Sequence, residues 1–247
     1  PWLGVPDLDL VVEPAAGGGD GATAPAQQLA RRLCRAVGPS GVLYVQEHGA
    51  YGTVELELQL PEGPLLLDLA SARRETYPEP GENPVVRFGR LDDDLARRDF
   101  TINAMALQLS GDGDGALVDP HAGLADLAAR RLRFLHGASV RDDPTRVVRG
   151  ARYAARLGFE LAPDSLAQIT GTLEDWPWAW RPGDPPAQAP PALATRRRME
   201  LELLLEREAW PRALAAQQRW GGRVLQHPAQ QAAPQGRRRR PRAARRG

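Results

Sequence analysis

The sequence contains no lysine, so all 32 of its basic residues are arginines. This absence excludes lysine Schiff-base chemistry and any phosphate-binding loop that depends on lysine. Cys34 is the single cysteine, and the chain can therefore form no internal disulfide. No apolar run approaches the roughly 20 residues of a membrane-spanning helix. Because a secretory signal is also lacking, we expect a cytoplasmic protein with no membrane partner.

Charge is distributed unevenly along the chain. Residues 237–247 contain seven of the 32 arginines and no acidic residue, whereas the rest of the chain has more acidic than basic residues. From His227 onward the composition is low-complexity Gln, Ala, Pro and Arg, without core residues. We expect residues 221–247 to be a disordered basic tail with weak, nonspecific affinity for RNA.

Two carboxylates lie close together near the start of the chain. Residues 7–13, DLDLVVE, alternate and then become apolar, which predicts a strand entering a core. Side chains two residues apart in a strand share a face, so Asp7 and Asp9 repel each other unless a cation lies between them. Carboxylate oxygens suit Mg²⁺, and phosphate oxygens can fill its remaining positions. The alternative is a solvated strand start after Pro6.

A third carboxylate interrupts a later apolar run. Residues 53–60 alternate between apolar and polar, which predicts a half-buried strand, and residues 65–70 return as a buried strand that contains Asp68. A carboxylate in such a run needs a partner, because burying it unpaired is costly. If this strand lies beside residues 7–13, Asp68 completes a metal cluster; a capping or edge position is the alternative. Residues 71–90 are polar and rich in Pro and Gly, which predicts a mobile loop.

Residues 97–106, RRDFTINAMA, interleave charged and apolar residues within one helical turn. Arg98, Asp99 and Asn103 fall close to Phe100, whereas a helix that only needs to be soluble separates its polar and apolar faces. One interpretation is a capped surface helix, with the preceding LDDD supplying acidic first-turn residues. The other is a functional joint between two parts of the protein, which the order of motifs along the chain favours.

A second dense cluster, RDDPTRVVRGARYAARLGF, occupies residues 141–159. Asp142 or Asp143 followed by Pro144 predicts a helix start. Polar residues then recur every three positions, so that neighbours in the row are adjacent on the helix surface. The row consists of Asp143, Arg146, Arg149 and Arg152. Its three arginines would repel one another without an anionic guest. The functional interpretation is that the row binds a base at its Asp143 end and phosphate at the other end. The alternative is that Asp143 caps the helix and the arginines form its solvated face.

Helices are expected in most of the remaining sequence. Thr23 is a helix cap by residue type, residues 166–173 and 210–220 have helical patterns, and Thr195 predicts the start of another helix. Residues 175–192 are rich in Trp and Pro and predict a loop, because proline cannot extend a helix.

Five segments occur in a recognisable order: DLDLVVE, LLLDLASARRE, RRDFTINAMAL, DPHAGLADL and RDDPTRVVRGARYAARLGF. In this order they resemble the bacterial class of tRNA nucleotidyltransferases, the CCA-adding enzymes, and their poly(A) polymerase relatives. The resemblance is strong over residues 5–160 and moderate over residues 193–220. Its most specific parts are RRDFTINAMA and the DDPTR pattern with its following arginines.

The resemblance implies an α+β fold in two parts. A nucleotidyltransferase head over residues 1–135 would carry metal carboxylates on a mixed β-sheet. An all-α neck over residues 136–220, interrupted by the Trp/Pro-rich loop at 175–192, would recognise the incoming nucleotide. By match to the motifs, Asp7 and Asp9 would bind Mg²⁺, and Asp68 would be the third catalytic carboxylate.

The resemblance also implies a set of residues that bind the nucleotide or shape its site. They are Arg98, Asp99, Asn103, Asp143, Arg146, Arg149 and Arg152. Arg98 would contact the triphosphate, and Asp99 and Asn103 would organise the junction between head and neck. Asp143 and Arg146 would read the base. Arg149 and Arg152 would contact the phosphates or the sugar.

The chemistry of these residues fits such an activity. Cytosine and adenine present an amino donor beside a ring-nitrogen acceptor, whereas uracil and guanine present a carbonyl acceptor beside an N–H donor. Asp143 as acceptor and Arg146 as donor match the first pair, so they would select CTP and ATP without a template. Two-metal chemistry with Mg²⁺ would activate the 3′-hydroxyl of an RNA. We therefore expect addition of C, A or both to tRNA, with no role for DNA.

Two features set the sequence apart from the family. The family's glycine-rich GGxVRD segment, which helps to bind the triphosphate, precedes the DxD strand, and we expect this chain, which begins at Pro1, to start after it. The Trp/Pro-rich stretch and the arginine-rich end do not resemble the family's RNA-gripping parts. Two alternatives stay open. One is a poly(A) polymerase, although the extra basic motif of bacterial poly(A) polymerases is missing; the other is an inactive RNA-binding remnant.

Overall fold

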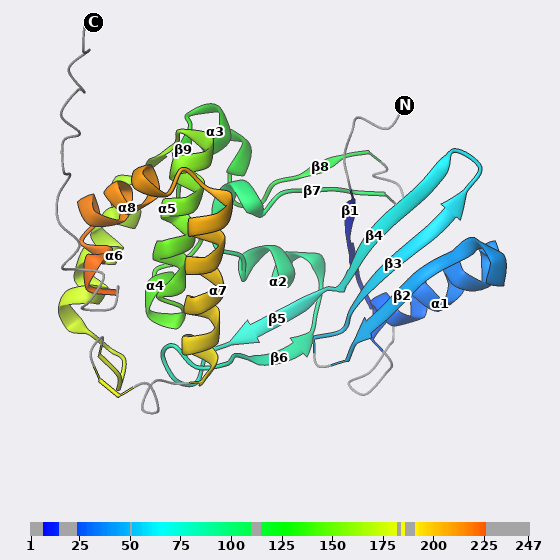
Figure 1. The fold of residues 1–247 in the computed structure, drawn as a ribbon, viewed down its shortest axis with the longest axis horizontal. Coiled ribbons are helices and arrows are strands. Elements are labelled where there is room, and N and C mark those ends of the chain that lie inside the picture. Colours follow the sequence, from blue (N-terminus) through cyan, green and yellow to red (C-terminus); the bar gives the residue numbers. More distant parts are fainter. Residues whose placement is uncertain are drawn as a thin grey trace, which may run out of the picture.

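A computed structural model of the chain describes residues 7–14, 24–49, 51–109, 115–181, 184–185 and 191–225. The predicted cap Thr23 and the predicted tail beyond Leu225 fall outside these residues. The described part is a mixed sheet joined to a group of helices, so the predicted α+β fold is confirmed (Figure 1). Among its helices, none is long and apolar enough to cross a membrane.

A four-stranded mixed sheet with the order β1-β4-β3-β2 forms the first part of the molecule. Its strands are β1 (Leu8–Val12), β2 (Val42–His48), β3 (Thr53–Leu60) and β4 (Gly63–Ser71). β1 pairs with β4 in parallel, and the other two pairs are antiparallel. Helix α1 (Pro25–Val37), followed by a 3₁₀ turn at Pro39–Gly41, packs Ala26 and Ala30 against one face. The predicted half-buried strand is confirmed, because Val54, Leu56 and Leu58 are buried on this face.

The chain leaves β4 through a hairpin of two short strands, β5 (Arg73–Thr76) and β6 (Val85–Phe88). The prediction of a mobile loop over residues 71–90 is therefore wrong for these two segments. Polar composition concealed the strands, because charged neighbours rather than an apolar core hold β5 in place: Glu75 forms ion pairs with Arg73 and Arg97. The hairpin extends from the sheet toward the helices (Figure 1).

The RRDFTINAMA stretch is not a surface helix. Helix α2 (Leu91–Ala96) ends before it, and Phe100 has extended backbone and forms an isolated bridge to Phe134. A 3₁₀ turn at Thr101–Asn103 follows, and then β7 (Ala106–Leu107), which pairs with β8 (Leu117–Val118). The physical reason is burial, because the Phe100 side chain is fully buried and stacks on Phe134 with ring centroids 5.0 Å apart.

Helices and two short strands make up the rest of the described chain. They are α3 (Gly123–Ala128), β9 (Arg131–Leu132), α4 (Ser139–Asp142), α5 (Thr145–Leu157), β10 (Glu160–Leu161), α6 (Pro163–Asp175), α7 (Pro191–Arg207), α8 (Trp210–Arg219) and a 3₁₀ turn at Gly222–Leu225. β9 and β10 pair in parallel. α5 packs against both α7 and α8. Phe100 lies in the same buried cluster as Val147, Ile169 and Trp220, so the two parts share a core.

The helix predicted to begin at Thr195 begins one turn earlier, at Pro191. Proline is tolerated in the first turn of a helix, and Leu193 extends the buried face of α7. In the Trp/Pro-rich stretch before it, Trp178 and Trp180 are buried, so this part of the predicted loop packs against the core.

Candidate functional site

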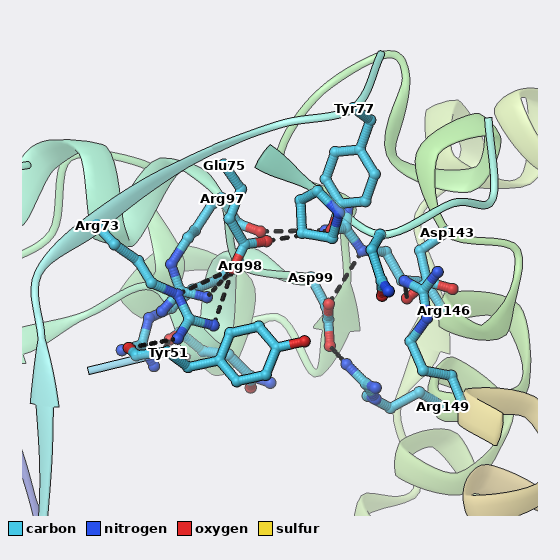
Figure 2. Close-up of a pocket in the computed structure, with 14 residues that line it drawn as sticks. Tyr51, Arg73, Glu75, Tyr77, Arg97, Arg98, Asp99, Asp143, Arg146 and Arg149 are labelled. Atoms are coloured by element: carbon cyan, nitrogen blue, oxygen red, sulfur yellow. Dashed lines mark hydrogen bonds and ion pairs between the residues drawn. The ribbon is translucent and has the colours of Figure 1, made fainter. Parts of the chain in front are cut away.

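A cavity of about 380 Å³ lies where the β5–β6 hairpin, the RRDFTINAMA stretch, α5 and α7 meet (Figure 2). Arginines from all four of these elements line it: Arg73, Arg97, Arg98, Arg146, Arg149 and Arg196. The lining also contains three carboxylates: Glu75, Asp99 and Asp143. The excess of arginines favours an anionic guest, because guanidinium groups form strong charge-assisted hydrogen bonds to phosphate.

Asp94 holds the first two arginines of RRDFTINAMA in place. Its side chain is fully buried, and each of its oxygens accepts from a different arginine. Oδ1 accepts from Arg97 Nε at 3.0 Å and Nη2 at 2.6 Å. Oδ2 accepts from Arg98 Nε at 3.2 Å and Nη2 at 2.8 Å. One buried carboxylate therefore fixes two adjacent guanidinium groups.

The two arginines differ in their remaining partners and in their exposure. Arg97 also donates to Glu75 Oε1 at 3.2 Å, and the Tyr77 hydroxyl donates to Glu75 Oε2 at 3.1 Å. Burial and the neighbouring Glu75 raise the pKa of Tyr77, which stays protonated. Among the described residues, Arg98 donates otherwise only to the Asn103 carbonyl, at 3.5 Å, and its side chain is 33% exposed. Arg98 is thus the better placed of the two to contact a phosphate.

Asp99 joins the sheet side of the cavity to α5. Its Oδ1 lies 3.0 Å from Arg146 Nε, and its Oδ2 accepts a hydrogen bond from Arg149 Nη1. Arg146 is only 3% exposed and also donates to the carbonyl of Arg97 at 3.1 Å. Asn103 lies nearby and donates to the Tyr153 hydroxyl at 3.5 Å. The acidic residue of the motif is therefore the charged link between the two parts of the molecule, as Figure 2 shows.

Asp143 is held at the start of α5 from both sides. Its Oδ1 accepts from the backbone N–H of Thr145, the first residue of α5, at 3.0 Å and from the Thr145 hydroxyl at 2.6 Å. Its Oδ2 accepts from Arg196 Nη1 at 2.9 Å. Arg196 Nη2 donates in turn to the carbonyls of Gly81 and Glu82 in the hairpin, at 2.8 and 3.1 Å. Arg196 therefore connects α7, α5 and the hairpin beside the cavity.

The two arginines predicted to contact phosphate or sugar are placed differently. Arg149 lines the cavity; burial alone lowers its pKa, but the nearby Asp99 and Glu200 raise it, and the residue stays charged. Arg152 does not line the cavity. Its side chain is buried against α7, and Nη1 donates to Glu200 Oε2 at 2.6 Å. A second contact joins it to Glu208 at 3.5 Å, so its charge is satisfied within the protein.

The predicted metal carboxylates lie together on the sheet rather than in the cavity. Leu8 and Leu10 face α1, so Asp7 and Asp9 lie on the opposite face. Asp9 pairs with Asp68 across the parallel strands β1 and β4, as the sequence predicted if these strands were neighbours. Glu55 of β3 continues the same row.

Negative charges lie close together along this row. Burial raises the pKa of Asp68, and the charges of Asp9, Glu55 and Asp7 raise it further. Oxygen donors with unbalanced negative charge fit Mg²⁺ chemically. Among the described residues, however, no group of three acidic, histidine or cysteine side chains is close enough to hold a metal as placed.

Several residues of the site are missing from the sequence-based assignment. Asp94 precedes the two arginines by three and four positions, the spacing of ion pairs on one helix face, and this signal could have identified it. Glu200 and Arg196 come from α7, 51 and 53 residues along the chain from their partners Arg149 and Asp143. Tyr51 comes from the turn between β2 and β3. Only the fold brings Arg196 and Tyr51 to the cavity and Glu200 to the arginines of α5.

The fold and the site define a nucleotidyltransferase head with an arginine-lined cavity at its junction with a group of helices. The family described as the poly(A) polymerase head domain matches residues 4–133, and the chain belongs to this family. The CC-adding tRNA nucleotidyltransferase of Deinococcus radiodurans is 44% identical over 177 residues, which cover 70% of this chain and 43% of that enzyme. The A-adding tRNA nucleotidyltransferase of Aquifex aeolicus is 41% identical over 156 residues, covering 63% of this chain and 17% of that enzyme.

Solved structures agree with this assignment. A CCA-adding enzyme in its apo form II matches 89% of this chain with a TM-score of 0.68 and 29% identity, and 45% of that chain is covered. A tRNA nucleotidyltransferase complexed with a primer tRNA and an incoming ATP analog matches 88% of this chain with a TM-score of 0.61 and 31% identity, and 53% of that chain is covered. The chain thus spans about half the length of these structures or less, and less than half of the curated relatives.

Proposed function

We propose that the chain is the nucleotide-selecting part of a template-independent nucleotidyltransferase that adds C, A or both to the 3′ end of tRNA. The observation that carries this proposal is the Asp99 junction, which joins the RRD segment to Arg146 and Arg149 of α5 around one arginine-lined cavity that Asp143 also lines. The CC-adding and A-adding relatives support the choice of nucleotides and acceptor. A cytoplasmic location fits this role and stays a prediction.

In the proposed complex, the triphosphate lies against Arg98 and Arg149. Within the part of the chain that the structure describes, Arg98 makes three hydrogen bonds, which occupy three of the five N–H donors of a guanidinium, and its side chain is 33% exposed. The base lies against Asp143 and Arg146, which are held by Thr145, Arg196 and Asp99 before any guest arrives. Arg152 supports α7 instead of touching the guest, because its partners are Glu200 and Glu208.

Asp7 and Asp9 would hold Mg²⁺, with Asp68 as the third carboxylate beside them on β4. When bound there, the metal would lower the pKa of the RNA 3′-hydroxyl and balance the charge of the leaving pyrophosphate. The carboxylates themselves would orient the acceptor end on the open face of the sheet. Arg98 and Arg149 would hold the α-phosphate end of the nucleotide in reach of that face.

A primer-extension assay with one nucleotide at a time tests this function. Acceptors would be tRNA ending in the discriminator base, in C or in CC, with CTP, ATP, UTP or GTP and Mg²⁺. We expect incorporation from CTP, ATP or both, no incorporation from UTP or GTP, and loss of activity in the Asp7→Ala, Asp9→Ala double variant. The assay is run on this chain and on a version preceded by the family's GGxVRD segment. Incorporation of neither C nor A by both proteins contradicts the proposal.

The same assay separates the two alternatives. Repeated addition of A to an RNA that already ends in CCA indicates a poly(A) polymerase. RNA binding that is unchanged by the double variant, without any incorporation, indicates a nonenzymatic RNA-binding protein.

A further inference from the structure

Tyr51 is an exposed aromatic residue at the sheet side of the cavity. It lies in the turn between β2 and β3, its side chain lines the cavity, and the residue is 44% exposed. Figure 2 shows its ring reaching into the cavity, with the hydroxyl toward the Asp99 and Arg149 pair. The ring belongs to none of the three buried clusters. Packing among the described residues therefore does not account for an aromatic ring at this place.

Gly52, the residue after Tyr51, is held in position by Ser71. Gly52 has a φ of 62°, and its carbonyl accepts from the Ser71 backbone N–H at 3.0 Å and from the Ser71 hydroxyl at 2.7 Å. A Cβ atom at Gly52 would lie 2.8 Å from a ring carbon of Phe88, so only glycine fits. A side chain on such a turn is preorganised, which reduces the entropy that a bound guest must overcome.

Arg73 supports the ring from one side. Its guanidinium carbon lies 5.3 Å from the Tyr51 ring centroid, and its Nη1 donates to the Tyr51 carbonyl at 3.2 Å. Arg73 is itself held by Glu75 Oε1, which accepts from its Nε at 3.0 Å. An aromatic ring backed by a cation is a good surface for a nucleobase, because any base can stack on it through its π-face.

The position of Tyr51 selects the RNA end rather than the incoming nucleotide. Asp143 and Arg146, which would read the incoming base, lie on the α5 wall, whereas Tyr51 comes from the sheet that carries the carboxylates. Thr53, at the start of β3, pairs with Ala70, two residues beyond Asp68 and so about 7 Å along the sheet. The side chain of Tyr51 and one nucleotide together can span the distance to the carboxylates, where the 3′-hydroxyl must lie.

We propose that Tyr51, backed by Arg73, stacks on the last base of the RNA acceptor. This inference rests on the proposed function and adds the subsite for the acceptor end. The chemistry suits an acceptor whose last base changes with each addition, because stacking depends little on which base is present. A hydrogen-bonding contact at this place would instead favour one stage of the reaction over the others.

The test uses a tRNA acceptor stem whose 3′-terminal nucleotide is 2-aminopurine, a base whose fluorescence falls when it stacks. The wild-type chain should quench the probe on binding. Tyr51→Leu should abolish most of the quenching and weaken RNA affinity about tenfold, the order expected for one stacked base. Tyr51→Phe and Tyr51→Trp should retain both. Tyr44→Leu is the matched control, since Tyr44 is similarly exposed, at 42%, but does not line the cavity.

Three outcomes overturn the inference. Quenching and affinity that are equal in wild type and Tyr51→Leu remove the stacking contact. A raised KM for CTP or ATP in Tyr51→Leu, with an unchanged KM for RNA, places the incoming base on Tyr51 instead. Equal loss of quenching and affinity in Tyr51→Leu and Tyr44→Leu shows that the effect does not depend on the ring that lines the cavity. RNA binding can be measured without nucleotide transfer, so the two proposals can fail separately. If quenching depends on Tyr51 but no nucleotide is added, the proposed function is wrong and the stacking contact stands. If nucleotides are added normally but quenching does not depend on Tyr51, the stacking contact alone is wrong.

Discussion

At the scale of single residues, carboxylates decide what the arginines of the cavity can do. Arg97 is held by two carboxylates, Asp94 and Glu75, and is 18% exposed, whereas Arg98 pairs with Asp94 and is 33% exposed beside the cavity. Asp99 performs the corresponding task for Arg146 and Arg149. Each guanidinium is thus oriented before a guest arrives, which is the condition for strong and selective phosphate contacts.

Asp94→Asn removes the buried charge that pairs with both Arg97 and Arg98. Loss of one partner from a buried ion pair is strongly destabilising, and we expect a decrease of about 3 kcal/mol in the free energy of unfolding. Urea denaturation measures this change. Asp92→Asn is the control, because Asp92 is an exposed residue of the same helix and should cost less than about 1 kcal/mol. Similar losses in both variants would show that Asp94 has no special role.

The charged Asp68 side chain should lower the free energy of unfolding when no cation is bound. Its pKa is raised, so the fold disfavours its ionised form, and the penalty is present at neutral pH, where the carboxylate is charged. Asp68→Asn should therefore raise the melting temperature of the metal-free protein. Added Mg²⁺ should raise that of the wild type and leave the variant unchanged. Glu57→Gln is the control, because Glu57 lies on the same face of the sheet as Glu55 but two residues further along β3. It should respond to Mg²⁺ like the wild type. An equal response in the wild type and both variants contradicts a metal site at Asp68.

His136 should make stability sensitive to mild acid. Burial and the adjacent Arg146 lower its pKa below the ordinary value of 6.5. The unfolded chain therefore binds the proton first as the pH falls, and stability is present above about pH 6.5 and lost below it. The urea midpoint should fall between pH 7.5 and pH 5.5, and fall less in His136→Gln. His48→Gln, which changes an exposed histidine, should keep the full pH dependence.

At the scale of elements, α3 supports the RRDFTINAMA stretch from behind. Thr101 donates to Asp126 of α3 at 2.8 Å, and Asp119 accepts from the Gly123 backbone N–H at 2.7 Å. A Cβ atom at Gly123 would lie 2.3 Å from the Thr101 carbonyl oxygen, a backbone atom that cannot move aside. The close approach of these two backbones keeps Asp99 and Asn103 in their places beside the cavity.

Gly123→Ala should force α3 and the 3₁₀ turn apart. We expect a loss of about 2–3 kcal/mol in the free energy of unfolding, with weaker nucleotide binding because the junction moves. Chemical denaturation and a nucleotide titration measure the two effects. Gly171→Ala in α6 is the control, since its Cβ would meet nothing within 4 Å and alanine favours a helix. A Gly123→Ala protein as stable as the wild type would show that the contact can relax.

Elements with an apolar pattern could be predicted from the sequence, and those held by charge could not. The alternation in β3 and the capping pattern before α5 gave their positions closely, because burial and capping leave local signals. β5 and β6 were missed, since charged partners from other elements stabilise β5. The same reason explains the missing site residues, because the pairing of Arg196 with Asp143 depends on how α7 packs on α5. The row from Asp143 to Arg152 winds around the helix, and its last member therefore faces Glu200 instead of the cavity.

At the scale of the whole molecule, the two parts are joined both by a shared core and by charge. Phe100 lies in the core of the helical part, and Asp99 beside it pairs with two arginines of α5. The cavity is therefore formed by both parts, and neither wall is complete alone. We expect this cavity to select CTP and ATP through the α5 wall and to hold their phosphates through the arginines around Asp99.

Equilibrium binding of the four nucleoside triphosphates, measured by calorimetry, tests this claim most directly. We predict that CTP and ATP bind at least tenfold more tightly than UTP and GTP, because uracil and guanine would place a carbonyl acceptor against the Asp143 carboxylate and an N–H donor against Arg146. Asp143→Asn should reduce this preference, and Asp99→Asn should weaken binding of all four nucleotides. Equal affinity for all four, or a preference that survives in Asp143→Asn, would contradict the account.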